Sequence, residues 1–222
     1  MNSKQIKHLE ELDKKYLWHP FTQMQAWEET TPLIIERGEG NYVYDIHGKK
    51  YLDGVSSLWV TVHGHGKKEI NEAIKKQIDQ ISHSTLLGLS NVPATLLAEK
   101  LIQIAPKNLK KVFYSDSGST SVEIALKMAF QYWKNRRSSL VVRRSSLELK
   151  SIKSQFLTFT NAYHGDTIGS VSVGGIDLFH SIYKPLLFKS IQANFENYVD
   201  LIKKHADELA AVIVEPMIQG AA

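Results

Sequence analysis

The sequence contains no cysteine among its 222 residues. Disulfide bonds and thiolate metal sites are therefore excluded, and the composition fits a reducing compartment. Long apolar runs are also absent. The clearest apolar run near the C-terminus, LAAVIV, is far too short to cross a bilayer. The N-terminal stretch MNSKQIKHLEELDKK is charged throughout and lacks the apolar centre of a signal peptide. These absences predict a cytoplasmic protein without a membrane anchor.

A net positive charge is confined to one segment. Residues 134–153 contain seven of the 27 Lys and Arg residues but only one of the 23 acidic residues, so the segment has a net charge of +6. The net charge of the whole chain is +4. The rest of the chain is slightly acidic, and no basic face of the kind that binds nucleic acid is expected. The sequence RRSSL occurs twice in this segment, at 136–140 and 143–147. We interpret the segment as a surface loop or helix extension.

The length of the whole chain, 222 residues, suits one large domain, or one and a half, with a substantial core. The first 110 residues show patterns typical of helices and one hairpin. Apolar spacing predicts a helix over 5–16, which Pro20 prevents from continuing. Alternating side chains predict a β-hairpin over 40–54, and two further amphipathic helices are expected over 67–82 and 91–105.

Strands and helices alternate from residue 111 onward. Strands are predicted over 111–115, 155–160 and 210–216, with helices beginning at Thr120 and spanning 195–210. This alternation predicts an α/β domain with a mainly parallel sheet. The run AAVIVE is continuously apolar, as expected for a strand that is buried on both faces.

Small polar residues separate the strand expected over 111–115 from the helix that follows. Thr120 and Glu123 match a capping box, so Gly118 and Ser119 should lie at a helix N-terminus. Free N–H groups and the helix dipole there attract an anion such as a phosphate. Taken alone, however, this stretch favours an ordinary capped helix start, because such starts with small polar residues are common. Neither a Walker A loop nor a G-x-G-x-x-G fingerprint is present.

Three other stretches contain candidate functional residues. Tyr163, His164 and Asp166 lie in a glycine-rich loop after the strand expected over 155–160, where Asp166 is expected only to cap the next turn. Trp59 follows the small residues of DGVSSLW, and Glu215 lies at the carboxyl end of a strand, where α/β sheets bind ligands.

A His-x-His pair raises the question of a metal site. His63 and His65 are flanked by glycines, and no cluster of carboxylates is near them in the sequence. We therefore interpret both as loop residues and expect no metal.

Five separated motifs together resemble a known family. DSGSTSVEIALKMA, YHGDTIG and VEPMIQGAA are similar to the fold-type I, class III aminotransferases, which use pyridoxal 5′-phosphate. WHPFTQM and DGVSSLW resemble the branch of that family that converts 8-amino-7-oxononanoate to 7,8-diaminononanoate in biotin biosynthesis, with S-adenosylmethionine as the amino donor. The similarity runs from about Trp18 to Ala222, and only the basic segment interrupts it.

The resemblance implies roles for residues in these motifs. Gly118 and Ser119 would bind the cofactor phosphate, and Tyr163 would lie against the pyridine ring and border the substrate. Glu215 would support the cofactor region. Trp59 would form an apolar wall for the aliphatic chain of the oxononanoate, although outside this motif it would be interpreted as a core tryptophan.

One position departs from the family pattern. The family often has a tyrosine at the position of Phe21, where a hydroxyl could bond the substrate. Phe21 would still border the substrate, but it cannot donate that hydrogen bond. The departure puts substrate contacts and the amino donor in question rather than the family.

The resemblance covers an incomplete fold-type I large domain with an N-terminal segment. It implies an N-terminal segment over 1–65, associated with the small domain, and a partial cofactor-binding domain over 66–222. No lysine here matches the family's Schiff-base lysine, so no catalytic residue is assigned. We expect the N-terminal half of an enzyme that is a homodimer when complete. A truncated reading frame, inactive alone, is favoured over one half of a split enzyme, because the break would expose an unpaired strand edge.

Two other functions stay open. The chain could come from a class III aminotransferase that acts on ω-amino acids or ornithine. It could also be a folded remnant without catalytic activity.

Overall fold

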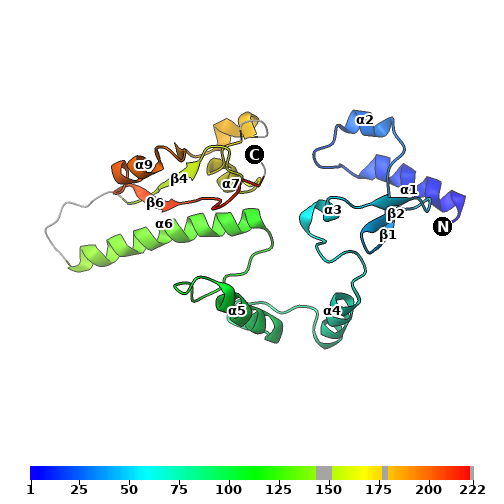
Figure 1. The fold of residues 1–222 in the computed structure, drawn as a ribbon, viewed down its shortest axis with the longest axis horizontal. Helices are drawn as coiled ribbons and strands as arrows, with labels where there is room; N and C mark the ends of the chain where they lie inside the picture. The colour runs from blue at the N-terminus through cyan, green and yellow to red at the C-terminus, as the bar shows by residue number, and fades with distance from the viewer. Residues whose placement is uncertain (144–151, 177–179, 221–222) are drawn as a thin grey trace. The chain divides into compact units, whose positions relative to one another are not determined.

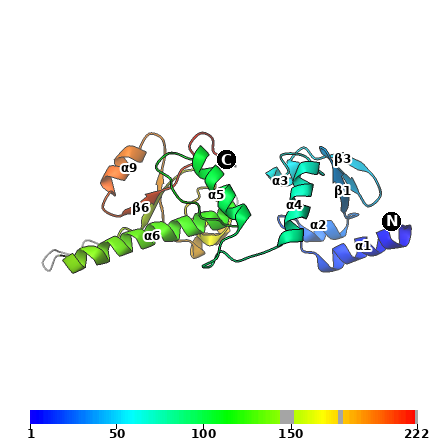
Figure 2. The same cartoon turned by 90° about the horizontal axis from the view of Figure 1, so that it is seen from below.

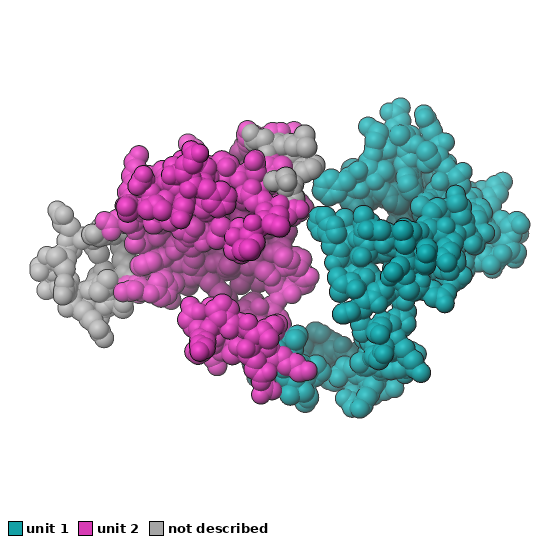
Figure 3. All heavy atoms as spheres, viewed as in Figure 1, with its two compact units in different colours: residues 1–97 teal, residues 98–222 magenta. Residues whose placement is uncertain are grey.

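The computed structural model describes residues 1–143, 152–176 and 180–220. The chain divides into two compact units, Met1–Leu97 and Ala98–Ala222 (Figure 3). The domain boundary expected after residue 65 refers to a complete enzyme and stays a prediction. Most of the second RRSSL copy lies outside the described residues, whereas the first copy lies inside a helix, as one of the two interpretations expected.

Unit 1 contains helices and a small antiparallel sheet. The sheet has the order β1-β2-β3, and its hairpin of β2 and β3 confirms the hairpin prediction (Figure 1). The helices expected over 5–16 and 67–82 are also confirmed. The elements are α1 (Ser3–Tyr16), α2 (Met24–Glu28), β1 (Ile35–Glu39), β2 (Tyr42–Asp45), β3 (Lys50–Leu52), α3 (Ser56–Trp59) and α4 (Lys68–Gln80).

The hairpin turn is organised by one buried carboxylate. Asp45 accepts hydrogen bonds from the backbone N–H groups of His47 and Lys49, at 2.9 and 2.8 Å, and from the Tyr51 hydroxyl at 2.8 Å. Gly48 has a φ of +81°, which side-chain-bearing residues seldom adopt. The sequence His47-Gly48 therefore makes the turn as expected.

Unit 2 is built around a parallel sheet of order β5-β4-β6. This arrangement confirms the α/β class and the mainly parallel sheet. The helix expected over 91–105 is confirmed as α5 (Val92–Ile104), which spans the division between the units. The other elements are α6 (Gly118–Arg143), β4 (Gln155–Phe159), α7 (Ile168–Ser172), η1 (Ser181–Leu186), β5 (Ile191–Ala193), α9 (Tyr198–Lys204) and β6 (Leu209–Val212).

Helices cover both faces of this sheet (Figures 1 and 2). Leu157 of β4 is fully buried in a cluster that includes Leu201 of α9. Its neighbour Phe156 points to the opposite face and packs with Leu126 and Val122 of α6. Because successive side chains of a strand alternate between faces, β4 anchors two apolar layers at once. Among the described residues, no helix is sufficiently long and apolar to span a membrane.

Residues 111–115 do not form a strand in this structure, and that prediction is wrong. A strand exists only where its backbone pairs with a neighbour, and no described strand pairs with this segment. Phe113 is accordingly exposed. The short strands β1 and β5 were not predicted, because three to five residues give too little alternation to recognise.

The first turn of α6 differs from the predicted capping box. The helix begins at Gly118, two residues before the predicted start. Ser117 Oγ accepts a hydrogen bond from the Thr120 N–H at 3.2 Å, and Thr120 Oγ1 accepts one from the Ser117 N–H at 3.1 Å. The reciprocal pair is therefore Ser117 and Thr120, not Thr120 and Glu123. Glu123 instead accepts a hydrogen bond from the Gly169 N–H at 2.7 Å.

Removing this cap should destabilise unit 2. Ser117→Ala should lower the free energy of unfolding by about 1 kcal/mol, because it deletes the acceptor for a first-turn N–H. Urea unfolding followed by circular dichroism measures the change. Ser154→Ala, an exposed serine ahead of β4, is the control and should have no comparable effect. Equal stability of the two variants would show that the Ser117 cap contributes nothing.

Candidate cofactor site

The first turn of α6 is fastened to the loop that follows β4. Ser119 Oγ accepts a hydrogen bond from the Asp166 N–H at 3.1 Å, and the Ser119 carbonyl accepts one from Ser170 Oγ at 3.0 Å. Together with the bond between Glu123 and Gly169, these contacts join segments about 50 residues apart in the sequence. The DSGSTSVE and YHGDTIG motifs therefore form one structure.

Gly165 makes this close approach possible. Its φ is +119°, and a Cβ atom at this position would collide with the Oγ and Cβ atoms of Ser119. Both the backbone conformation and the space require glycine. The glycine of the YHGD stretch is thus explained by its packing against the start of α6.

Gly118 has the opposite environment. It is exposed, and a Cβ atom built there would meet no atom of this chain within 4 Å. Among the described residues, none accepts a hydrogen bond from the backbone N–H of Gly118 or Ser119. Both groups lie at the N-terminus of a helix of 26 residues. Open space, two available donors and the positive end of a helix dipole fit an anionic group such as a phosphate.

Glu215 ties the segment after β6 to the same loop. Its Oε1 atom accepts a hydrogen bond from the Tyr163 N–H at 2.8 Å, and its Oε2 atom accepts one from the Gly220 N–H at 2.7 Å. The side-chain amide of Gln219 donates to the Thr160 carbonyl at 2.8 Å. Glu215 therefore fixes the backbone of Tyr163 from the edge of the sheet where β4 and β6 end.

The side chain of Tyr163 is held by Asp166. The Tyr163 hydroxyl donates to Asp166 Oδ2 at 2.7 Å, while His180 Nε2 lies 3.2 Å from Asp166 Oδ1. The rings of Tyr163 and His180 are nearly parallel, with centroids 6.3 Å apart. The hydrogen bond to Asp166, and then burial, raise the pKa of Tyr163 to about 12. The phenol thus keeps its proton at neutral pH.

Asp166 and His180 were not recognised as partners of Tyr163 from the sequence. Asp166 was expected only to cap a turn. That prediction is wrong, because its side chain instead contacts the Tyr163 hydroxyl and His180. His180 lies 14 residues further on, in a stretch without a distinctive pattern. His164, in the YHGD stretch itself, has its pKa lowered by burial, and its Nε2 atom is 3.4 Å from Thr158 Oγ1.

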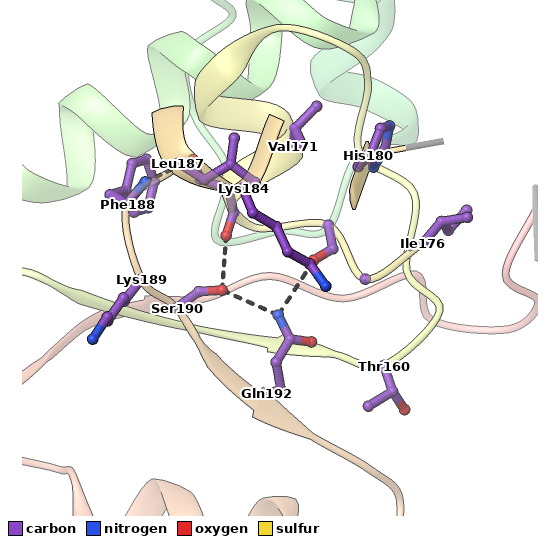
Figure 4. A pocket seen from close by; sticks show the side chains of 13 residues that line it. Thr160, Val171, Ile176, His180, Lys184, Leu187, Phe188, Lys189, Ser190 and Gln192 are labelled. Atoms are coloured by element: carbon purple, nitrogen blue, oxygen red, sulfur yellow. Dashed lines mark hydrogen bonds between the residues drawn. The ribbon is translucent and has the colours of Figure 1, made fainter. Parts of the chain in front are cut away.

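A cavity of about 440 Å³ is lined in part by His180 (Figure 4). Lys184, Phe188 and Ser190 contribute to its wall. Gln192 braces it, donating to the Gly174 carbonyl at 3.2 Å and to Ser190 Oγ at 3.1 Å. His180, which stacks on Tyr163, is therefore also part of the wall of this cavity.

Trp59 and Phe21, the residues expected near a substrate, belong to unit 1. Trp59 is 68% exposed and Phe21 is 89% exposed, so neither is a core residue. Both have positive φ values, of +73° and +51°. Both residues are therefore exposed on the surface of unit 1, and both have a backbone conformation that non-glycine residues rarely adopt.

The turn that carries Phe21 is held by contacts with α1. His19 Nε2 lies 3.2 Å from Asp13 Oδ1, and the Trp27 indole N–H donates to the same oxygen at 2.8 Å. The rings of His19 and Trp27 have centroids 4.4 Å apart. The buried Asp13 carboxylate of α1 thus holds the WHPF turn in place.

Comparison with known families identifies the chain's relatives. The family model described as "Aminotransferase class-III" matches residues 23–222. The chain belongs to the class-III aminotransferase family. This family depends on pyridoxal phosphate, and membership confirms the fold-type I prediction made from the motifs.

Curated relatives within the family share a name. The chain is 48% identical to the adenosylmethionine-8-amino-7-oxononanoate aminotransferase of Geobacter sulfurreducens and 50% identical to that of Staphylococcus aureus. The alignments cover 96% and 97% of this chain but 49% and 50% of those proteins. The chain therefore spans about half the length of the curated relatives it matches.

Solved class-III structures have the same fold. The enzyme of that name from Methanocaldococcus jannaschii is 51% identical, with a TM-score of 0.83 over 96% of this chain and 48% of its own. An ω-transaminase from Pseudomonas jessenii, solved in complex with PMP, is 29% identical, with a TM-score of 0.76 over 95% of this chain and 49% of its own.

The bond between Tyr163 and Asp166 predicts an unusual tyrosine titration. Because the folded-state pKa of Tyr163 lies above the ordinary value of about 10, the bond stabilises the fold below pH 10, and this contribution is lost as pH rises toward 12. Asp166→Ala should return the pKa of Tyr163 to near 10. The measurement is phenolate absorbance, taken as the difference between each protein and its Tyr163→Phe counterpart.

The control for this titration is Asp200→Ala, which changes an acidic residue in the first turn of α9. It should leave the difference titration unchanged. A Tyr163 that ionises with the other tyrosines in the unsubstituted chain would contradict the assignment.

Proposed function

We propose that this chain is the N-terminal half of a pyridoxal 5′-phosphate-dependent aminotransferase of biotin biosynthesis. The complete enzyme converts 8-amino-7-oxononanoate to 7,8-diaminononanoate, with S-adenosylmethionine as the amino donor, and works as a cytoplasmic homodimer. One observation carries the proposal. Ser119, Tyr163 and Glu215, predicted from three separate motifs, meet in a single hydrogen-bonded network beside an open helix N-terminus.

The cofactor phosphate is assigned to the start of α6. The N–H groups of Gly118 and Ser119 point out of the first turn, and the space that a Cβ atom would take at Gly118 is open. The Oγ atom of Ser119 accepts a bond from Asp166 and keeps its own proton for donation. The site is thus composed of hydrogen-bond donors, as a phosphate dianion requires.

The cofactor ring is assigned to the face of Tyr163. When bound, pyridoxal 5′-phosphate supplies an electron sink for the reacting substrate carbon. Tyr163 contributes a planar surface, and Glu215 and Asp166 fix its backbone and its hydroxyl respectively. Because two carboxylates lock both ends of the residue, its ring has one orientation against which a flat cofactor can lie.

The substrate is assigned to the exposed aromatic residues of unit 1. Trp59 and Phe21 offer apolar surface that suits the aliphatic chain of 8-amino-7-oxononanoate. Phe21 contributes no hydrogen bond. None of the chain's lysines lies in a motif that matches the family's Schiff-base lysine, so the proposal assigns no catalytic residue to this chain and expects it to be inactive alone.

Binding of pyridoxamine 5′-phosphate tests the phosphate site. This form carries an amine instead of an aldehyde, so it cannot react with surface lysines. The chain should bind it more tightly than pyridoxamine, which lacks the phosphate. Gly118→Val should reduce that preference about tenfold or more, because its side chain takes the phosphate's space, which corresponds to about 1.4 kcal/mol. Fluorescence titration measures both affinities.

Gly54→Val is the matched control. Gly54 also has open space around its Cβ position and lies outside the assigned site. Both variants should unfold at the temperature of the unsubstituted chain. Equal affinities for the two ligands in the unsubstituted chain, or an unchanged preference in Gly118→Val, would rule out the assigned phosphate site.

A substitution at Trp59 separates this function from that of an ω-transaminase. In the full-length protein that contains this chain, Trp59→Ala should raise the KM for 8-amino-7-oxononanoate about tenfold or more, through lost apolar contact. Activity toward a short ω-amino acid should change far less. Steady-state kinetics with both substrates measures the difference, with Leu33→Ala, another exposed apolar residue of unit 1 that lies outside both motifs, as the control. Equal losses for both substrates would argue against the oxononanoate assignment.

A further inference from the structure

The turn that carries Trp59 is built from residues ill suited to it. Ser56, Ser57, Leu58 and Trp59 have φ values of +49°, +48°, +62° and +73°. L-amino acids, unlike achiral glycine, avoid this left-handed region, because their Cβ atom approaches the next carbonyl oxygen. No glycine or asparagine relieves the strain within the turn. A run of four such residues persists only where other contacts hold it.

Besides backbone bonds such as that from the Trp59 N–H to the Val55 carbonyl at 2.8 Å, Asp53 supplies three such contacts. Its Oδ1 atom accepts a hydrogen bond from the Ser57 N–H, and its Oδ2 atom accepts one from the Ser57 hydroxyl, both at 2.8 Å. The Asp53 carbonyl accepts a third from the Ser56 N–H at 3.2 Å. The bond from the Ser57 N–H, and then the bond to His65, keep the pKa of Asp53 below its usual value. The side chain is therefore an ionised acceptor for the strained turn.

His65 connects Asp53 to the sheet of unit 1. His65 Nε2 lies 2.8 Å from Asp53 Oδ2, and the Asp53 side chain is only 9% exposed. The backbone of His65 pairs with Gly40 through two hydrogen bonds, of 2.7 and 3.0 Å. A Cβ atom at Gly38 in β1 would lie 2.5 Å from His65 Cγ, so the imidazole packs directly on the strand. The turn is thus anchored, through Asp53 and His65, to β1.

We infer that Asp53 is the positioning residue that holds the strained turn and so displays Trp59 on the surface. The part of this inference that concerns substrate rests on the proposed function, in which Trp59 contacts an aliphatic chain. Loss of Asp53 frees the Ser57 N–H and hydroxyl, and the four residues relax toward negative φ. Trp59 then leaves the position from which it contacts the substrate, although Asp53 itself touches no substrate.

The first arm of the test observes Trp59 directly. The ¹⁵N-labelled chain has four tryptophans, whose indole N–H signals can be assigned with Trp→Phe variants. Asp53→Ala should shift the Trp59 signal by more than its line width. The signals of Trp27 and Trp133, which donate to Asp13 and to the Ala210 carbonyl, should stay in place. The control is Asp79→Ala on α4, an exposed aspartate, which should move none of them.

A second variant separates positioning from general stability. Glycine tolerates positive φ, so Ser56→Gly in the Asp53→Ala chain should return the Trp59 signal toward its original position. A carboxylate that merely stabilised unit 1 would not be replaced by a glycine in the turn. A Trp59 signal that is unchanged in Asp53→Ala would overturn the inference. So would the loss of all four signals without rescue by glycine.

The second arm uses the full-length protein that contains this chain. Asp53→Ala should raise the KM for 8-amino-7-oxononanoate about tenfold with a smaller change in kcat, and Ser56→Gly should reverse part of that rise. A Trp59 signal that moves while KM is unchanged would support Asp53 as the positioning residue and count against the substrate role of Trp59. The two arms thus distinguish failure of the inference from failure of the proposed function.

Discussion

The arrangement of the candidate site depends on one contact, the approach of the loop after β4 to the first turn of α6. Gly165 allows the approach, and Ser119 accepts the backbone N–H of Asp166 there. The aromatic ring of Tyr163 is brought to the end of the helix, and the first backbone donors of α6 stay open beside it. A single side chain at position 165 would separate the two motifs.

The sequence predicted those parts of the fold that depend on local pattern. Helices α1 and α4 have clear apolar periodicity, and the run around Ala211 is apolar throughout, so these elements could be expected. The segment around Phe113 has the composition of a strand, but pairing decides whether a strand forms, and pairing is not local. The cap of α6 was placed wrongly because Ser117 and Thr120 are both good capping residues and only geometry chooses between them.

The candidate site was predictable where motifs name the residues, and not where residues from distant segments meet. Gly118, Ser119, Tyr163 and Glu215 came from a resemblance carried by short motifs. The partner of Asp166, by contrast, is His180, and no pattern in the intervening stretch points to that contact. The left-handed turn was also unforeseeable, because serine, leucine and tryptophan have no preference for positive φ. A similar arrangement recurs at Phe21, where Asp13 and His19 brace a turn with an exposed aromatic residue.

The bonds made by Glu215 have a consequence for the order in which the chain is made. The Tyr163 N–H donates to Glu215, which lies 52 residues further along the chain. The Glu215 carboxylate also accepts a hydrogen bond from the Gly220 N–H. Translation proceeds from the N-terminus, so the helix end and its loop leave the ribosome well before the glutamate that fixes them. Until then the Tyr163 N–H lacks this acceptor. The last hydrogen bonds of this network therefore form only after residue 220 has emerged from the ribosome.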